Sequence, residues 1–249
     1  MAGHSKWASI KHKKAATDAK RGKLFTKLAR AITVAAREGG GDAEGNPALA
    51  TAIEKAKSYS MPKDNIQRAI DRGTGEGADA DAIERILYEG YGPGGAAILV
   101  ETLSDNRNRT GSEVRHAFDR HGGNLGEPNS VAWIFHKRGV ITVAAAKYSE
   151  DDLIIAIDAG AEDVVADEDE LRVITEPGAL TTVREALEAE GIEIEGSEVT
   201  MEPTNTVEVN EKEARGLLRL METLDDHDDV DAVHANFDIP AEILERVAA

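Results

Sequence analysis

The stretch GVITVAAAKYSEDDLIIAIDAGAEDVVADEDELRVITEPGALTTVREALEAEGIEIEGSEVTME, residues 139–202, alternates strand and helix patterns in an order that specifies a fold. Short runs rich in Val and Ile are typical of strands, and the longer segments between them carry apolar residues at helical spacing. The order strand, helix, strand, strand, helix, strand is that of a ferredoxin-like βαββαβ domain. The expected strands span 139–145, 162–167, 170–176 and 192–202, and the expected helices span 149–160 and 178–191.

The segments on either side of this stretch predict a second domain, which the first one interrupts. Before it, the apolar run AAILVETL indicates a strand, and Thr110 with Glu113 forms the pattern of a helix capping box. After it, a strand, a helix and a further strand follow in the same order, so the two flanks can share one sheet. The expected elements are a turn or short helix at 83–87, strands at 96–103, 130–136, 205–210 and 230–238, and helices at 110–123 and 211–226.

The first third of the chain reads as three short helices. Leu24, Leu28 and Ile32 recur at helical spacing, Pro47 follows a capping Asn, and Pro62 opens a third apolar-periodic segment. We therefore expect an α+β protein with an N-terminal three-helix bundle, a discontinuous α/β middle domain and an inserted ferredoxin-like domain. The expected limits are 1–80 for the basic arm and bundle, 81–138 with 204–249 for the middle domain, and 139–203 for the acidic ferredoxin-like domain.

Charge is distributed unevenly along the 249 residues, whose formal net charge is -18. Residues 1–72 carry 15 basic and 7 acidic side chains, whereas residues 139–203 carry 3 basic and 18 acidic ones. Such an asymmetry is typical of a protein with one end that binds polyanions and another that repels them. An ordinary acidic protein with a solvated basic tail is the alternative interpretation.

The basic arm at the start of the chain is the main candidate for contact with phosphate. On a helix, the spacing of Lys20, Lys23, Lys27 and Arg30, three, four and three residues, places these cations in one stripe. Trp7 lies among the basic residues and could stack on a base. The candidate nucleic-acid-binding residues of the arm are Lys6, Trp7, Lys11, His12, Lys13, Lys14, Lys20, Lys23, Lys27 and Arg30.

Arg107 and Arg109 form a second candidate, at the predicted junction between a strand and a helix. A helix N-terminus attracts anions, and the guanidinium fork matches phosphate geometry. Pairing of the two arginines with nearby carboxylates such as Asp105 is an equally good interpretation, and the sequence leaves both open.

Catalytic and metal-binding patterns are weak throughout the sequence. The glycines of YEGYGPGG precede a strand, whereas a dinucleotide fingerprint follows one, and His227 in DDHDD lacks a metal-ligand spacing. The chain contains no Cys, which excludes a thiol nucleophile and a disulfide framework. No run approaches the ~20 apolar residues of a membrane span. We therefore expect a cytoplasmic protein that is not an enzyme, with no catalytic residue, metal, cofactor, small-molecule substrate or membrane partner.

Several long motifs resemble the YebC family of probable transcriptional regulators, which includes PmpR and is related to the mitochondrial translational activator of cytochrome c oxidase. They are MAGHSKWASIKHKKAATDAKRGKLFTKLAR, MPKDNIQRAIDRGTG, EGYGPGGAAILVETLSDNRNRT and VRHAFDRHGGNLG, all within residues 1–136. A weaker match extends through VHANFD, so that the resemblance covers essentially the whole chain.

This resemblance implies three domains, no enzymatic activity and DNA-binding regulation of transcription in the cytoplasm. It also implies an alternative, a ribosome-associated translation factor that binds ribosomal RNA and relieves stalling at proline-rich stretches. Both functions suit a basic arm that meets phosphate. The sequence leaves open which nucleic acid is the partner, which genes are targets and whether the chain forms oligomers.

Overall fold

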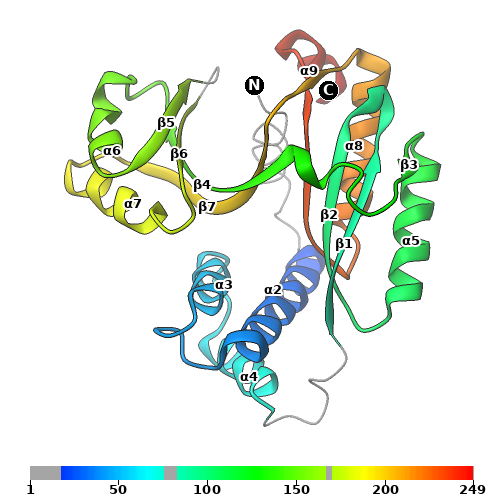
Figure 1. Ribbon diagram of the computed structural model, residues 1–249, viewed down its shortest axis with the longest axis horizontal. Helices are drawn as coiled ribbons and strands as arrows, with labels where there is room; N and C mark the ends of the chain where they lie inside the picture. The colour runs from blue at the N-terminus through cyan, green and yellow to red at the C-terminus, as the bar shows by residue number, and fades with distance from the viewer. Residues whose placement is uncertain (1–17, 76–82, 167–169, 249) are drawn as a thin grey trace. The chain divides into compact units, whose positions relative to one another are not determined.

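The computed structural model describes residues 18–75, 83–166 and 170–248, and it shows an α+β protein, as predicted (Figure 1). The described chain divides into two compact units. Residues 133–205 form one unit, and the described residues up to Ala132 form the other together with residues 206–248. The finer division into three domains with limits at 80, 138 and 203 stays a prediction.

The unit of residues 133–205 has the predicted ferredoxin-like topology. Its sheet has the strand order β5-β6-β4-β7, and every pair of neighbouring strands is antiparallel. This is the arrangement that the βαββαβ order demands, because each helix crossover skips one strand of the sheet. The strands are β4 (Phe135–Ala144), β5 (Ala161–Ala166), β6 (Glu170–Thr175) and β7 (Ile194–Pro203), and the helices are η4 (Asp151–Leu153), α6 (Ile154–Asp158) and α7 (Leu180–Ala189).

Alternation along β4 builds the core of this unit. Ile141 and Val143 are fully buried and pack in one cluster with Leu153, Val183 and Leu187 from the helical segments. The predicted helix at 149–160 begins as a 3₁₀ turn, and there the carboxylate of Asp152 accepts hydrogen bonds from both the backbone N–H and the hydroxyl of Ser149, each at 2.8 Å.

The predicted three-helix bundle is present at the start of the other unit. Leu28, Ile32, Leu49 and Ile66 are buried together between its helices. Asn46 fixes the connection between the first two helices: its side chain caps the second helix and donates to the carbonyl oxygen atoms of residues 35 and 40. The helices are α2 (Asp18–Gly39), α3 (Pro47–Ser58) and α4 (Lys63–Gly73).

A four-stranded antiparallel sheet with the order β3-β1-β2-β9 forms the rest of this unit. Helices α5 and α8 cover one face of it, where Ile98 and Val100 pack against Phe118, Leu217 and Leu220 (Figure 1). The elements are β1 (Glu84–Tyr91), η2 (Pro93–Gly95), β2 (Ala97–Ser104), α5 (Arg107–Arg120), β3 (Asn124–Leu125), β8 (Val207–Glu208), α8 (Glu211–Asp225), β9 (Val230–Ala235), β10 (Phe237–Asp238) and α9 (Ala241–Ala248). The short helix η3 (Ala132–Ile134) contains the residues at which the chain passes from this unit to the other.

Two local predictions are wrong. In the segment 83–87, expected as a turn or short helix, residues 84–87 belong to β1, which pairs with β2 over eight consecutive positions. The segment 130–136, expected as a strand, forms a bend and η3, and the strand starts only at Phe135. The buried carboxylate of Glu89 explains the bend, because it accepts backbone N–H groups from Asn129, Val131 and Ala132 at 2.6–2.8 Å.

None of the described helices is both long enough and apolar enough to cross a membrane.

We predict that Gly73→Ala lowers the free energy of unfolding by about 1–3 kcal/mol, the range of overpacking mutations. A Cβ atom at this position would clash with the carbonyl oxygen of Thr33 and lie 2.8 Å from the Cβ atom of Ala36, because α4 crosses α2 closely here. Urea unfolding measures the change. Gly22→Ala is the matched control within α2, since nothing lies within 4 Å of its Cβ position, and it should leave stability unchanged or slightly raised.

Candidate nucleic-acid interface

Helix α2 carries the described part of the basic stripe predicted from the sequence. Lys20, Lys23, Lys27 and Arg30 all belong to this helix. Cations that lie three and four residues apart on a helix share one face, so Lys23, Lys27 and Arg30 lie on one face of α2. The other arm residues, Lys6, Trp7, Lys11, His12, Lys13 and Lys14, lie outside the described residues.

Three cations of this stripe meet an acidic loop of the same chain, residues 225–229 between α8 and β9. The Nζ atom of Lys23 lies 3.5 Å from a carboxylate oxygen of Asp228, and Lys27 donates a hydrogen bond to the carbonyl oxygen of Asp225. Arg30 donates to the carboxylate of Asp229 at 2.6 Å and to the carbonyl oxygen of Asp228 at 3.0 Å. Part of the stripe is therefore neutralised within the molecule.

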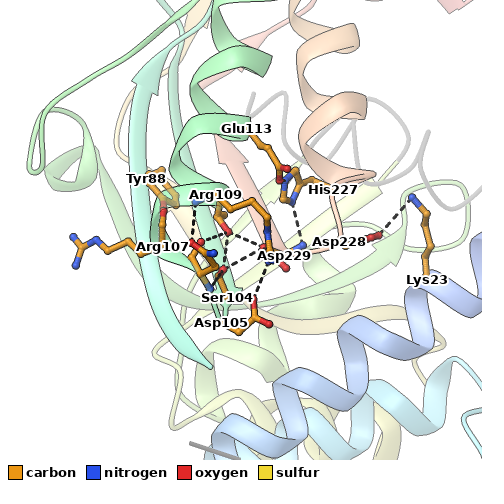
Figure 2. Close-up of polar contacts among 12 residues, drawn as sticks. Lys23, Tyr88, Ser104, Asp105, Arg107, Arg109, Glu113, His227, Asp228 and Asp229 are labelled. Atoms are coloured by element: carbon orange, nitrogen blue, oxygen red, sulfur yellow. Dashed lines mark hydrogen bonds and ion pairs between the residues drawn. The ribbon is translucent and has the colours of Figure 1, made fainter. Parts of the chain in front are cut away.

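These contacts differ in their exposure to solvent, and therefore in how strongly they hold the two side chains together. The side chains of Lys23 and Asp228 are 59% and 64% exposed, so this pair is weakly coupled and open to competition (Figure 2). Asp229, in contrast, is 3% exposed and Arg30 is 26% exposed. At its Arg30 end the stripe is bound to Asp229, which precedes β9, whereas at its Lys23 end it faces solvent.

Asp229 collects hydrogen bonds from several elements that are distant in sequence (Figure 2). Its carboxylate accepts from Arg109 at 2.7 Å, from Thr110 at 2.6 Å and from Ser104 at 3.2 Å, in addition to Arg30. Burial alone would raise the pKa of Asp229, but the hydrogen bonds from Thr110, Arg109 and Arg30 outweigh it and hold the pKa well below its usual range. The carboxylate stays ionised and joins α2, α5 and β2 to the start of β9.

The N-terminus of α5 lies earlier than the sequence predicted. Asn106 is the N-cap, and its side chain accepts a hydrogen bond from the backbone N–H of Arg109 at 3.1 Å. The predicted capping box of Thr110 and Glu113 is wrong, because Thr110 lies inside the helix, where its hydroxyl donates to Asp229. A local pattern cannot report this choice, since the partner of Thr110 is 119 residues away.

Arg107 and Arg109, predicted together as a phosphate-binding pair, have different surroundings. Arg109 pairs with Asp105 at 2.9 Å and with Asp229 at 2.7 Å, which is the structural alternative left open by the sequence. The side chain of Arg107 points away from this network, and only its backbone carbonyl oxygen takes part, as acceptor from the hydroxyl of Tyr88 (Figure 2). Contact with phosphate stays a prediction for both residues.

His227, whose acidic surroundings in DDHDD lack a metal-ligand spacing, is held by contacts with other residues of the protein. Its Nε2 atom lies 2.7 Å from a carboxylate oxygen of Glu113, and its Nδ1 atom accepts the backbone N–H of Asp229 at 3.1 Å. Among the described residues, no group of three or more His, Asp or Glu side chains could hold a metal ion.

Comparison with known proteins covers both units. The sequence model of the TACO1/YebC protein N-terminal domain matches residues 5–76, and that of the TACO1/YebC second and third domain matches residues 83–237. The chain belongs to the TACO1/YebC family. The resemblance drawn from the sequence motifs is therefore confirmed.

Relatives match this YebC-family chain over its full length. A probable transcriptional regulatory protein of Rubrobacter xylanophilus is 56% identical over 249 residues, and one of Desulfotalea psychrophila is 57% identical over 250 residues; each match covers 100% of both chains. A crystal structure of a conserved hypothetical protein, Aq1575, from Aquifex aeolicus is 49% identical, with a TM-score of 0.81, and the match covers 94% of this chain and 97% of that one.

We predict that Asp229→Asn lowers the free energy of unfolding at pH 7 by about 3 kcal/mol, because the arginines keep their charge and lose a buried partner. The folded-state pKa of Asp229 is depressed, so its stabilising effect is complete above the unfolded pKa, near 4, and is lost as the pH falls below it. Urea unfolding at pH 7 and pH 3 should thus show a smaller difference between parent and variant at pH 3. An equal difference at both pH values would contradict the assigned ionisation.

Proposed function

We propose that this YebC-family chain is a non-enzymatic regulator of gene expression that binds nucleic acid through the basic arm and the exposed end of the α2 stripe. One observation carries the proposal. In a protein of net charge -18, the first 30 residues hold nine Lys or Arg and one acidic residue. One of these cations, Lys23, has a solvent-exposed side chain. Concentrated positive charge of this kind binds phosphate and releases counterions.

Two relatives that match over the whole chain are named probable transcriptional regulatory proteins, and these names support regulation of transcription through DNA. A ribosome-associated role with ribosomal RNA as the ligand is the alternative. The acidic unit favours it, because residues 139–203 would repel a second nucleic-acid strand but suit the basic proteins of a ribosome. Sedimentation of lysate with and without nuclease separates the two: migration with ribosomes supports translation, and enrichment of promoter DNA by the free protein supports transcription.

We expect Lys20→Glu with Lys23→Glu to weaken binding to a 20-base-pair DNA duplex and a 20-nucleotide RNA. Each lost phosphate contact lowers the slope of log affinity against log salt by about 0.7–0.9, so the pair should lower it by about 1.5. Arg30 is left unchanged, because a Glu beside the buried Asp229 would disturb folding. Fluorescence anisotropy between about 50 and 200 mM KCl measures the slope.

The matched control is Lys55→Glu with Lys57→Glu, two exposed positions of α3 that change the net charge of the same bundle equally. The proposal requires a larger loss from the α2 pair than from the α3 pair. Equal losses would mean that total charge, and no particular helix face, determines binding.

We further expect Asp228→Asn to raise the affinity for the same oligonucleotides by about twofold to fivefold, since an exposed ion pair contributes about 0.2–1 kcal/mol. The carboxylate of Asp228 lies 3.5 Å from Lys23 and occupies the position that a phosphate would take. Asp226→Asn changes the same acidic loop and the same net charge but leaves the carboxylates of Asp228 and Asp229 in place, so it serves as the control. Equal gains in both variants would show that Asp228 does not compete for Lys23.

A further inference from the structure

The few basic residues of the C-terminal segment, residues 204–249, lie close together on α8 and α9. Residues 204–249 contain 12 acidic side chains and only four basic ones, Lys212, Arg215, Arg219 and Arg246. The first three lie three and four residues apart on α8, so they form one stripe along that helix. Arg246 joins them from α9, because its backbone carbonyl oxygen accepts a hydrogen bond from Arg215 at 3.0 Å.

This α8 stripe lines an open hollow of about 490 Å³. The described residues that line it are Lys212, Arg215, Gly216 and Arg219, with Glu211 as the one carboxylate among them. The glycine lets the chain approach closely, since a Cβ atom there would lie 2.9 Å from a ring carbon of Pro93.

The carboxylate of Glu211, beside the hollow, already pairs with two arginines. Arg215 lies 3.0 Å from Glu211, and Arg246 lies 3.5 Å from the other oxygen of the same carboxylate. Within the described part of the chain, Lys212 and Arg219 form no ion pair. These two cations therefore face the hollow and solvent without a neutralising partner.

The neighbouring end of α5 adds positive charge to the same surface. His121 follows α5, and its Nε2 atom lies 2.9 Å from the hydroxyl of Thr223 on α8. Burial lowers the pKa of His121, and the positive charges of Arg120 and Arg219 lower it further. Two arginines from different helices thus act on one imidazole, which places a local positive potential on a face of an otherwise acidic segment.

We propose that the α8 hollow is a second contact site for the phosphodiester backbone of nucleic acid, separate from the α2 stripe. The cations span seven residues of helix, about 10 Å at 1.5 Å per residue, which is longer than one phosphate group and suits a polyanion. Among the described residues no aromatic side chain lines the hollow, so these residues offer charge without base stacking and read no sequence. This inference rests on the proposed nucleic-acid-binding function.

The two contact sites lie toward opposite ends of α8. The C-terminal end of the helix meets the α2 stripe, where Lys27 donates to the carbonyl oxygen of Asp225. Lys212 lies 13 residues earlier, which is about 20 Å along the helix. A nucleic acid long enough to reach both sites gains from an intramolecular second contact, whereas a shorter one does not. The second site should therefore matter for a 20-nucleotide ligand and much less for a four-nucleotide one.

The test uses the full chain with Lys212→Gln and Arg219→Gln, two exposed positions whose loss breaks no ion pair among the described residues. Lys55→Gln with Lys57→Gln removes the same charge from exposed positions of α3, neither of which forms an ion pair among the described residues, and is the control. Fluorescence anisotropy with a 20-nucleotide RNA, a 20-base-pair DNA and a four-nucleotide RNA gives the affinity and its salt dependence. Comparison of the RNA and DNA arms identifies which backbone the site prefers.

The proposal expects the α8 variant to bind the 20-nucleotide RNA or the duplex on the order of tenfold more weakly, with a salt slope lower by about 1.4–1.8. The control should match the parent, and circular dichroism should show all three proteins equally folded. An α8 variant that binds like the control overturns the second site, while a loss in the Lys20 and Lys23 variant leaves the proposed function standing. A folded parent that binds none of the three ligands overturns the proposed function, and the second site with it.

Discussion

The buried carboxylate of Asp229 is the interaction on which the larger unit depends. It accepts hydrogen bonds from α2, β2 and α5 while its own backbone leads into β9. A buried charge is tolerated only when it is paired and hydrogen-bonded, so these elements must come together for the carboxylate to be stable. Arg30 is the bond that reaches into the helical bundle. Together with the hydrogen bond from Lys27 to the carbonyl oxygen of Asp225, it holds α2 and its basic stripe beside the loop that precedes β9.

A single helix face consequently has two roles along its length. At one end, Arg30 pairs with the buried Asp229 and stabilises the fold. At the other end, Lys23 stays exposed beside Asp228. Proteins can separate structural cations from binding cations by exposure alone, because solvent screening weakens the outer pair and burial strengthens the inner one. The acidic loop of residues 225–229 therefore sets where along α2 a phosphate could compete.

The sequence predicted the parts of the fold that depend on local periodicity. The ferredoxin-like order and the three-helix bundle follow from strand and helix patterns within short windows, and both are present. The segment 83–87 was mistaken because its strand is made by pairing with β2, and the cap of α5 because Thr110 is bound by a residue 119 positions away. The role of Arg30 was hidden for the same reason, since its partner is 199 positions distant. Asp229 itself reads as one more solvated acid in DDHDD, and nothing local marks it as buried.

The acidic composition has a consequence for recognition under the proposed function. A uniformly basic protein would hold a polyanion in many orientations, whereas the cations proposed to bind it here, on α2 and in the α8 hollow, belong to a chain with 47 acidic and 29 basic side chains. Like-charge repulsion then excludes most alternative poses, and electrostatic complementarity contributes orientation more than affinity. Since α8 connects both sites as one rigid helix, their separation is fixed by its rise per residue. Under this proposal a ligand must have phosphates that reach from the α2 stripe along α8 to the hollow. Neither site could impose this geometric requirement alone.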